Sequence, residues 1–282
     1  MTVNPEMLNA LRLQARACER FGSPFNGAFV DHIADDYAGG GPVAGLLAPW
    51  DGADLKTIFD EAAPIRIANT FNHLAMGGEA PALSAAWPRP GATPDPEAAW
   101  VAAREAIGPH RAMLEAFLTH EPQTNEVGRT AVLLGGFLEV AAQTGLPLRV
   151  FEVGASAGLN QFWDRFHYEL GPHRWGDPAS GVRIATDWQG GPPRLTAALE
   201  VVERGACDRR PTDLTDPTQR RRLLACIWPD QFDRQARSRA AIELALANAV
   251  QVDAADALTW TRAKVAPKAG AEGAIRVRPA WA

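Results

Sequence analysis

The chain has 282 residues, of which 46% are apolar and 22% are charged, and its formal net charge is -5 at pH 7. This composition is typical of a soluble globular protein with one or two cores, and it excludes a disordered or fibrous chain. No apolar run is long enough to cross a bilayer, and residues 1–5 lack the pattern of a secretory signal, so we expect a cytoplasmic protein with no membrane partner. The negative charge argues against nucleic acid as a partner. Cys18, Cys207 and Cys226 show no CxxC spacing, so the sequence predicts neither disulfides nor a metal site.

The first 121 residues carry helical signals and no strand-like alternation. Asn4 before Pro5 predicts an N-cap followed by a proline in the first helical turn, and Gly22 ends that helix. We therefore expect an α-helical N-terminal region, residues 1–121, that acts as a lid on the domain that follows. Its predicted helices cover residues 5–21, 25–36, 43–47, 65–76 and 97–118, the last bent or split at Gly108-Pro109.

A dense polar segment, residues 122–129, opens the helix that precedes the first strand. It contains Gln123, Asn125, Glu126 and Arg129. Such a group can meet a bound zwitterion or its reaction partner. The competing interpretation is a capping box with a surface ion pair. We treat these four residues as candidates for substrate binding.

The central stretch is an apolar run, Leu148–Val153, that ends in the small-residue loop Gly154-Ala155-Ser156-Ala157-Gly158. This pattern predicts a strand, a tight turn and a helix, an arrangement that brings the backbone close to a ligand. The dinucleotide pattern G-x-G-x-x-G is not met, because Ser156 and Leu159 stand where glycines are required.

Two other kinds of site fit the loop. The G-x-S-x-G nucleophile elbow matches letter for letter, which would make Ser156 the nucleophile of an α/β-hydrolase-like esterase. The only histidines downstream are His167 and His173, which are too near in sequence to supply the base. The acid-x-G-x-G-x-G loop of class I S-adenosylmethionine-dependent methyltransferases fits with Glu152 as the acid and Ser156 in place of the middle glycine. A plain strand-to-helix turn is the third possibility.

Two further acids follow predicted strands. The segment 182–188 is predicted as the next strand and ends near Asp187. A helix is predicted over residues 195–204. Val250–Val252 is predicted as the third strand and precedes Asp256. A carboxylate after the second strand of a nucleotide fold takes the ribose hydroxyls, and an acid after the third strand of a methyltransferase site holds the adenine amino group. We therefore interpret Glu152, Asp187 and Asp256 as converging on the crevice where open parallel sheets bind ligands. Each acid by itself is an ordinary turn or cap residue.

The stretch Trp228-Pro229-Asp230-Gln231 is an unusual turn before a long helix. Asp230 is placed to cap that helix. Trp228 can close the edge of a core or wall a ligand pocket, because aromatic rings stack on flat ligands. We include Trp228, Asp230 and Gln231 among the candidates that face the substrate.

Several short motifs carry a resemblance when they are taken together. They are Gln123-Thr124-Asn125-Glu126, the stretch 152–160, Gly176-Asp177-Pro178, Cys207-Asp208 and Trp228-Pro229-Asp230-Gln231. This combination resembles an uncharacterised bacterial family, domain of unknown function 2332, from the N-terminus to about Val265, and the resemblance implies a class I methyltransferase-like fold. Members of that family continue into an apolar strand with a His-Ser and Trp-Gln signature. Here Gly270–Pro279 follows instead, which we interpret as a truncation or a shifted reading frame.

These patterns predict an α/β protein: the helical region 1–121, and then a Rossmann-like three-layer sandwich of the class I methyltransferase type over residues 122–282, with its C-terminal strands missing. The expected activity is S-adenosylmethionine-dependent methyl transfer to a small-molecule acceptor, with no catalytic residue assigned. The alternatives are the Ser156 esterase and a cofactor-binding relic without turnover. After Val265 only Ala274–Val277 has a β pattern, and it is short and carries a charge. If this segment fails to pair, the strand 148–153 has an open edge through which we expect the protein to self-associate.

Overall fold

The structure of the chain is a computed structural model that describes residues 3–265 and 274–279. The chain divides into two compact units, one of residues 1–123 and 221–235 and the other of residues 124–220 and 236–282. Helices and a parallel sheet together make it a mixed α/β protein. Residues 221–235 group with the N-terminal helices, whereas the sequence places them in the α/β region. Among the described residues, no helix is long and apolar enough to cross a membrane.

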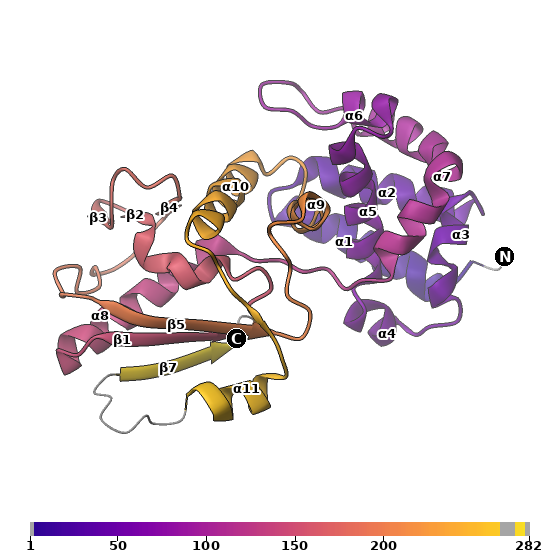
Figure 1. Cartoon of the computed structure of the whole chain (residues 1–282). Coiled ribbons are helices and arrows are strands. Elements are labelled where there is room, and N and C mark those ends of the chain that lie inside the picture. The colour runs from indigo at the N-terminus through magenta and orange to yellow at the C-terminus, as the bar shows by residue number, and fades with distance from the viewer. Residues whose placement is uncertain (1–2, 266–273, 280–282) are drawn as a thin grey trace. The chain divides into compact units, whose positions relative to one another are not determined.

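The first unit is helical, and five of its helices lie where the sequence predicts them. The helices Leu55–Asp60 and Pro81–Ala86 are not predicted by the sequence. α1 spans Pro5–Arg20, and the Asn4 side chain caps it by accepting a hydrogen bond from the Glu6 N–H at 3.0 Å. α7 runs from Pro96 to Leu118 as one helix, so Pro109 does not split it. The other helices are α2 Pro24–Ala38, α3 Val43–Leu47, η1 Ala48–Trp50, α4 Leu55–Asp60, α5 Ala63–Gly77, α6 Pro81–Ala86 and most of α9 Pro217–Ala225 (Figure 1).

An aromatic cluster forms the centre of the helical core. The ring of Phe29 on α2 makes edge-to-face contacts with Trp87, Phe71 and Trp100, with ring centroids 5.1, 5.7 and 5.8 Å away. All four side chains are buried. Because aromatic pairs add to the free energy of burial, these contacts fix α2 against α5 and α7.

The second unit is centred on a parallel sheet with the strand order β6-β5-β1-β7. β1 lies between β5 and β7, so both of its edges are paired (Figure 1). β5 and β6 lie on one side of β1 and β7 lies on the other, so the strand order reverses at the end of β1. The strands are β1 Leu148–Val153, β5 Val201–Asp208, β6 Asp253–Ala254 and β7 Ala274–Pro279.

The structure corrects the strand assignments that follow β1. The segment Arg183–Thr186 is β4, and it belongs to a separate three-stranded sheet with the order β3-β2-β4. The neighbour of β1 is β5, although the sequence of residues 195–204 predicts a helix. Pairing with β1 satisfies the backbone groups of β5, and this tertiary gain outweighs the local preference for a helix. The third strand is β6, which begins just after the predicted Val250–Val252.

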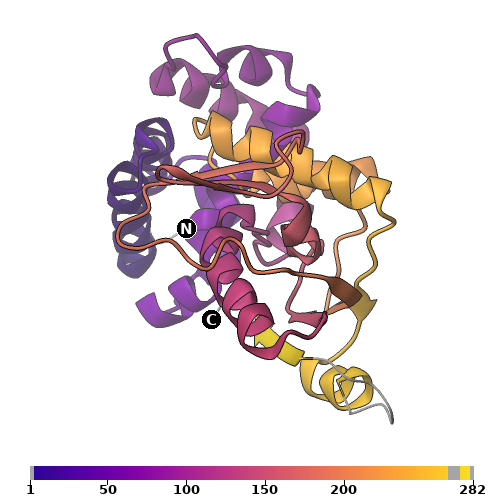
Figure 2. The same ribbon diagram turned by 90° about the vertical axis from the view of Figure 1, so that its left-hand side faces the viewer.

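β7 covers the edge of β1 that we expect to be open. It pairs with β1 from Leu148 opposite Ala274 to Val153 opposite Pro279. In both views β7 lies between α8 Thr130–Thr144 and α11 Ala257–Lys264 (Figures 1 and 2). The prediction that this strand is missing, and that β1 has a free edge, is therefore wrong. Residues 266–273 and 280–282 lie outside the described residues.

Aromatic rings attach the small sheet to the rest of the second unit. Trp163 stacks on Phe137 of α8 at 4.3 Å and on Trp175 at 6.2 Å, and the Tyr168 hydroxyl donates to the Trp163 carbonyl at 2.7 Å. The remaining elements are η2 Val127–Arg129, η3 Leu159–Arg165, β2 His167–Leu170, β3 His173–Trp175 and α10 Phe232–Ala247. The sequence predicts a helix over Leu159–Tyr168 after the glycine loop, whereas the structure has the 3-10 helix η3, which ends at Arg165, and places Tyr168 in β2.

Candidate functional site

The glycine loop leaves β1 at its carboxyl end through three left-handed residues. Gly154, Ser156 and Gly158 have φ values of 66°, 54° and 72°. A Cβ on Gly158 would lie 2.5 Å from the Gln161 side chain and 2.7 Å from Val252, so this position requires glycine. Ser156 adopts a conformation that costs a side-chain-bearing residue about 1–2 kcal/mol. The loop thus follows β1 at the point where ligands of open parallel sheets bind.

Several N–H groups of the loop and of the start of η3 already donate hydrogen bonds within the protein. Ala155 N donates to the Cys207 carbonyl at 3.1 Å, and Ser156 N donates to the Asp208 carboxylate at 2.8 Å. Leu159 N, at the start of η3, donates to the Asn125 side chain at 3.0 Å. Gly158 N and Gln161 N bond to carbonyls of the loop itself at 2.8 and 3.2 Å. An anion-binding loop offers its N–H groups to the ligand, whereas here these groups already have acceptors.

Three side-chain oxygen atoms at the loop, unlike these N–H groups, lack hydrogen-bond partners among the described residues. Glu152 Oε2, Ser156 Oγ and Asn160 Oδ1 are buried and have no hydrogen-bond partner among the described residues. The other Glu152 oxygen accepts a hydrogen bond from the Asn160 amide at 3.4 Å. Buried polar atoms are usually paired, so three acceptors without donors indicate a place for a donor-rich or cationic group.

Glu152 is the acid of this site; the residue is half-buried, and its Oε2 atom is fully buried. Burial raises the pKa of its carboxyl from 4.5 to about 7. The hydrogen bond from Asn160 and the positive charge of Arg129 act in the opposite direction, while the negative charge of Asp208 raises the pKa further. A cation placed beside Glu152 would favour its ionised form.

Asp208, at the end of β5, is the second acid of the loop region. Its two oxygens accept hydrogen bonds from Ser156 N and Arg210 N, both at 2.8 Å. This is the end of the strand beside β1, where the sequence predicts Asp187. Asp187 instead follows β4 of the small sheet, so it does not lie at the end of a main-sheet strand. Asp208 is not predicted as a site residue, because residues 195–204 are assigned to a helix and not to the strand that ends at Asp208.

Asp256 serves as a helix cap. Its carboxylate accepts from Thr259 N at 3.0 Å and from Thr259 Oγ1 at 3.1 Å, at the start of α11. These hydrogen bonds lower the pKa of the Asp256 carboxyl. Of the three acids predicted to converge, the structure therefore gives Glu152 to the loop, Asp256 to a cap and Asp187 to another sheet.

The polar segment before α8 contributes unequally to the site. Asn125 is buried and holds the first turn of η3 through Leu159 N, so it is joined to the glycine loop. Arg129 acts on Glu152 through its charge. Glu126 accepts from Gly128 N at 2.8 Å and lies 3.5 Å from Arg237, as expected for a cap with an ion pair. Gln123 falls in the helical unit.

The turn Trp228–Gln231 belongs to the helical unit. Asp230 accepts a hydrogen bond from Phe25 N at 3.0 Å and another from the Ser23 hydroxyl, so its carboxylate supports the start of α2 and not, as predicted, of the following helix. The Gln231 amide donates to the Phe21 carbonyl at 3.3 Å. The Trp228 carbonyl accepts from Gln231 N at 3.1 Å. These contacts give the motif a structural role within its own unit.

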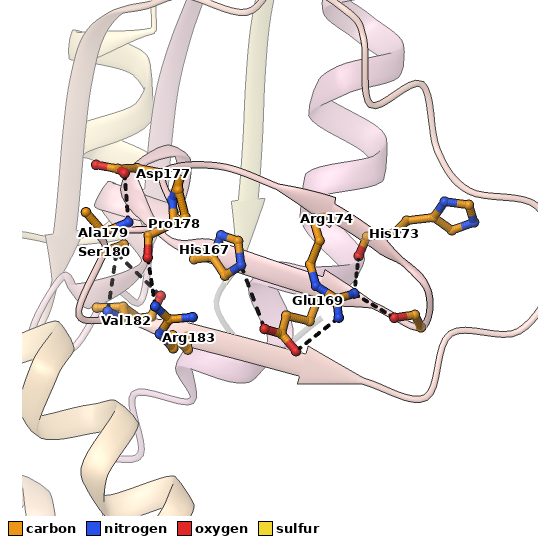
Figure 3. A network of polar contacts seen from close by, with 11 residues as sticks. His167, Glu169, His173, Arg174, Asp177, Pro178, Ala179, Ser180, Val182 and Arg183 are labelled. Carbon is orange, nitrogen blue, oxygen red and sulfur yellow. Dashed lines mark hydrogen bonds and ion pairs between the residues drawn. The ribbon is translucent and has the colours of Figure 1, made fainter.

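The motif Gly176-Asp177-Pro178 is also explained by local structure. Gly176 has a φ of 86°, and a Cβ there would lie 2.0 Å from the Phe166 carbonyl oxygen. Asp177 then accepts from Ala179 N at 2.8 Å to form the turn. Figure 3 shows this turn beside the polar face of the small sheet, where the side chains of His167 and Arg174 point towards Glu169 at 3.8 and 3.7 Å.

The structure and the site define a mixed α/β protein with a glycine-rich loop at the carboxyl end of its central strand. The chain belongs to the family DUF2332, described as an uncharacterised protein conserved in bacteria, which matches residues 8–277. The predicted resemblance to this family is confirmed, while the methyltransferase-like fold that it implies stays a prediction. The match continues past Val265, where we expect it to end, and into β7. No curated protein and no solved structure matches the chain.

Proposed function

We propose that the α/β unit binds S-adenosylmethionine and that the protein transfers its methyl group to a small-molecule acceptor. The strand order supports this proposal. β1 is central, β5 and β6 lie on one side and β7 on the other, which is the order of the first four strands of a doubly wound nucleotide fold. The glycine loop follows β1 at the reversal point, where such folds bind ligands.

The observation that carries the proposal is the set of acceptors without donors at Glu152, Ser156 and Asn160. An ammonium group has three N–H donors and no acceptor, so it complements this set. S-adenosylmethionine carries such a group and a second positive charge on its sulfonium. A dinucleotide carries phosphates, and it would meet two acids and N–H groups that are already bonded.

Each neighbouring residue has a role in this proposal. Glu152 would hold the ammonium, and Asn125 would keep the loop in place through Leu159. Asp208 replaces Asp187 as the candidate for the ribose hydroxyls, since a carboxylate oxygen that accepts one hydrogen bond can accept a second. The cofactor supplies an electrophilic methyl carbon, and its transfer leaves a neutral thioether. The residues of the chain contribute by orienting the reactants, a contribution that does not require a strong base.

Titration calorimetry with S-adenosylmethionine, S-adenosylhomocysteine and NADH tests the proposal. We expect both adenosyl ligands to bind and NADH not to bind. Glu152→Gln should weaken binding by about tenfold or more, because a hydrogen bond to a charged group contributes about 1.5–3 kcal/mol. Asp187→Asn is the matched control, and it should leave the affinity unchanged.

The pH dependence of binding gives a second readout. The ammonium requires the ionised carboxylate, so affinity should rise with pH through about 7, where the pKa of Glu152 lies, and the rise should be absent in Glu152→Gln. If the folded protein gives no heat with either adenosyl ligand at millimolar concentration, the proposal is wrong. Binding without methyl transfer to any acceptor would favour a cofactor-binding relic.

The esterase alternative depends on Ser156. Its left-handed backbone resembles that of an elbow nucleophile, but its hydroxyl has no hydrogen-bond partner among the described residues and therefore no base. A fluorophosphonate probe should leave Ser156 unlabelled. Ser156→Gly should weaken ligand binding without abolishing it, because the oxygen atoms of Glu152 and Asn160 remain. Labelling that is lost in Ser156→Ala would reverse the order of the two hypotheses.

A further inference from the structure

A polar stripe runs along α5 in the helical unit. Arg66, Asn69 and His73 are spaced by three and four residues, so they share one face of the helix. Their exposed fractions are only 8%, 3% and 5%. Arg66 Nε, Asn69 Nδ2 and His73 Nδ1 are buried, and none of them has an oxygen or nitrogen hydrogen-bond partner among the described residues. The Asn69 amide has a contact with the Cys226 thiol, which is only a weak acceptor. Buried polar side chains are usually hydrogen-bonded, so this stripe indicates a binding partner that supplies the hydrogen bonds.

Two arginines of α9 complete the group. Arg221 Nε is a fourth buried nitrogen without an acceptor. The Arg222 guanidinium packs over the Phe117 ring at 4.2 Å, and the His73 ring lies 4.9 Å from the same ring. We call Arg66, Asn69, His73, Arg221 and Arg222 the α5–α9 cluster.

The charge of this cluster is not balanced. Arg221 forms an ion pair with Glu79 at 2.9 Å. Neither Arg66 nor Arg222 has an ion-paired carboxylate among the described residues, although a buried charge without a counter-ion is costly. Burial lowers the pKa of His73, and the positive charges of Arg221 and Arg222 lower it further, to about 4. These charges show that the positive field of the cluster acts on His73.

Helix capping explains part of this arrangement. Arg66 donates to the Leu118 carbonyl at 3.2 Å and Arg222 donates to the Phe117 carbonyl, so both satisfy the C-terminus of α7. Capping uses one N–H of each guanidinium. It does not involve the four buried nitrogen atoms, and it supplies no full negative charge.

We propose that the α5–α9 cluster binds a small oxyanion, the phosphate or carboxylate group of a ligand. Oxyanions accept several hydrogen bonds and pair with guanidinium groups, so they complement the N–H groups of Arg66, Asn69 and Arg221 and the two arginines without carboxylates. His73 adds a third donor type to the cluster in the tautomer that carries the proton on Nδ1. The glycine loop shows the reverse pattern, since its unpartnered atoms are all oxygens. The ligand would enter past Arg221, whose side chain is 24% exposed. This site is independent of the proposed methyl transfer.

The test is a titration of the full chain with inorganic phosphate and, separately, with acetate, each against sodium chloride at equal ionic strength. Calorimetry and thermal unfolding would both be recorded, because a ligand that binds only the folded state raises the melting temperature in a saturable way. We expect one of the two anions to bind saturably, and the better one identifies the chemistry of the ligand.

Asn69→Leu is the decisive variant. It replaces an amide whose only recorded contact is the weak one with the Cys226 thiol by an apolar side chain of similar size. The variant should therefore fold about as well as the wild type while binding the anion at least tenfold more weakly. Arg66→Lys should also weaken binding, because it removes Nε and keeps the charge. Arg16→Lys, at an exposed position of α1, should have no effect. If neither anion exceeds chloride in the wild type, or if Asn69→Leu binds as the wild type does, the proposal is refuted.

Discussion

Replacing Glu152 by Gln should stabilise the folded protein in a pH-dependent way. Burial raises the pKa of Glu152 from 4.5 to about 7, so the folded state resists ionisation of this carboxyl. Below the unfolded-state pKa of 4.5 the Glu152 carboxyl is protonated in both the folded and the unfolded state, so it does not change the free energy of unfolding. As pH rises through this window the folded state loses stability, and above it the loss is complete. The shift corresponds to ~3 kcal/mol at about 1.4 kcal/mol per pKa unit.

The Glu152→Gln variant removes this cost. At about pH 8 it should exceed the wild type by ~3 kcal/mol, and at about pH 5 by only ~1 kcal/mol, because most of the titration lies between these values. Denaturant unfolding at both pH values measures the two differences. The same substitution at the exposed Glu105 is the control, and it should have little effect at either pH. An equal gain for Glu152→Gln at both pH values would show that its carboxyl is not held in the protonated form.

Two further predictions concern residues to which the structure gives structural roles. Gly176→Ala should destabilise the protein by more than ~2 kcal/mol, because the new Cβ would overlap the Phe166 carbonyl, whereas Gly190→Ala has open space and should cost about 1 kcal/mol for its positive φ alone. The difference between the denaturant midpoints of the two variants measures the cost of the steric overlap, because both variants share the cost of the positive φ. Asp230→Ala should cost ~1–3 kcal/mol because it leaves the start of α2 without its acceptor, while Asp233→Ala at an exposed site should be nearly neutral in the same thermal scans.

The three acids predicted to form one site show what the sequence does not determine. Glu152, Asp187 and Asp256 look alike in the sequence, since each follows an apolar segment. The structure gives them a buried site, a small separate sheet and a helix cap. Asp208 reaches the loop only because β5 pairs with β1. The role of an acid depends on which strand is its neighbour, and strand neighbours are distant in the sequence.

The sequence by itself determined the features that arise within one or two turns of the chain. Asn4 and Pro5 start α1 because a cap and a proline act on adjacent N–H groups, and the apolar run before Gly154 forms β1 and its turn for similarly local reasons. Tertiary structure alone decided that residues 201–208 form a strand, that β7 closes the edge of β1, and that Asn125 supports the glycine loop. Backbone pairing and burial over long sequence separations outweigh local preference, so these features appear only when the chain is folded.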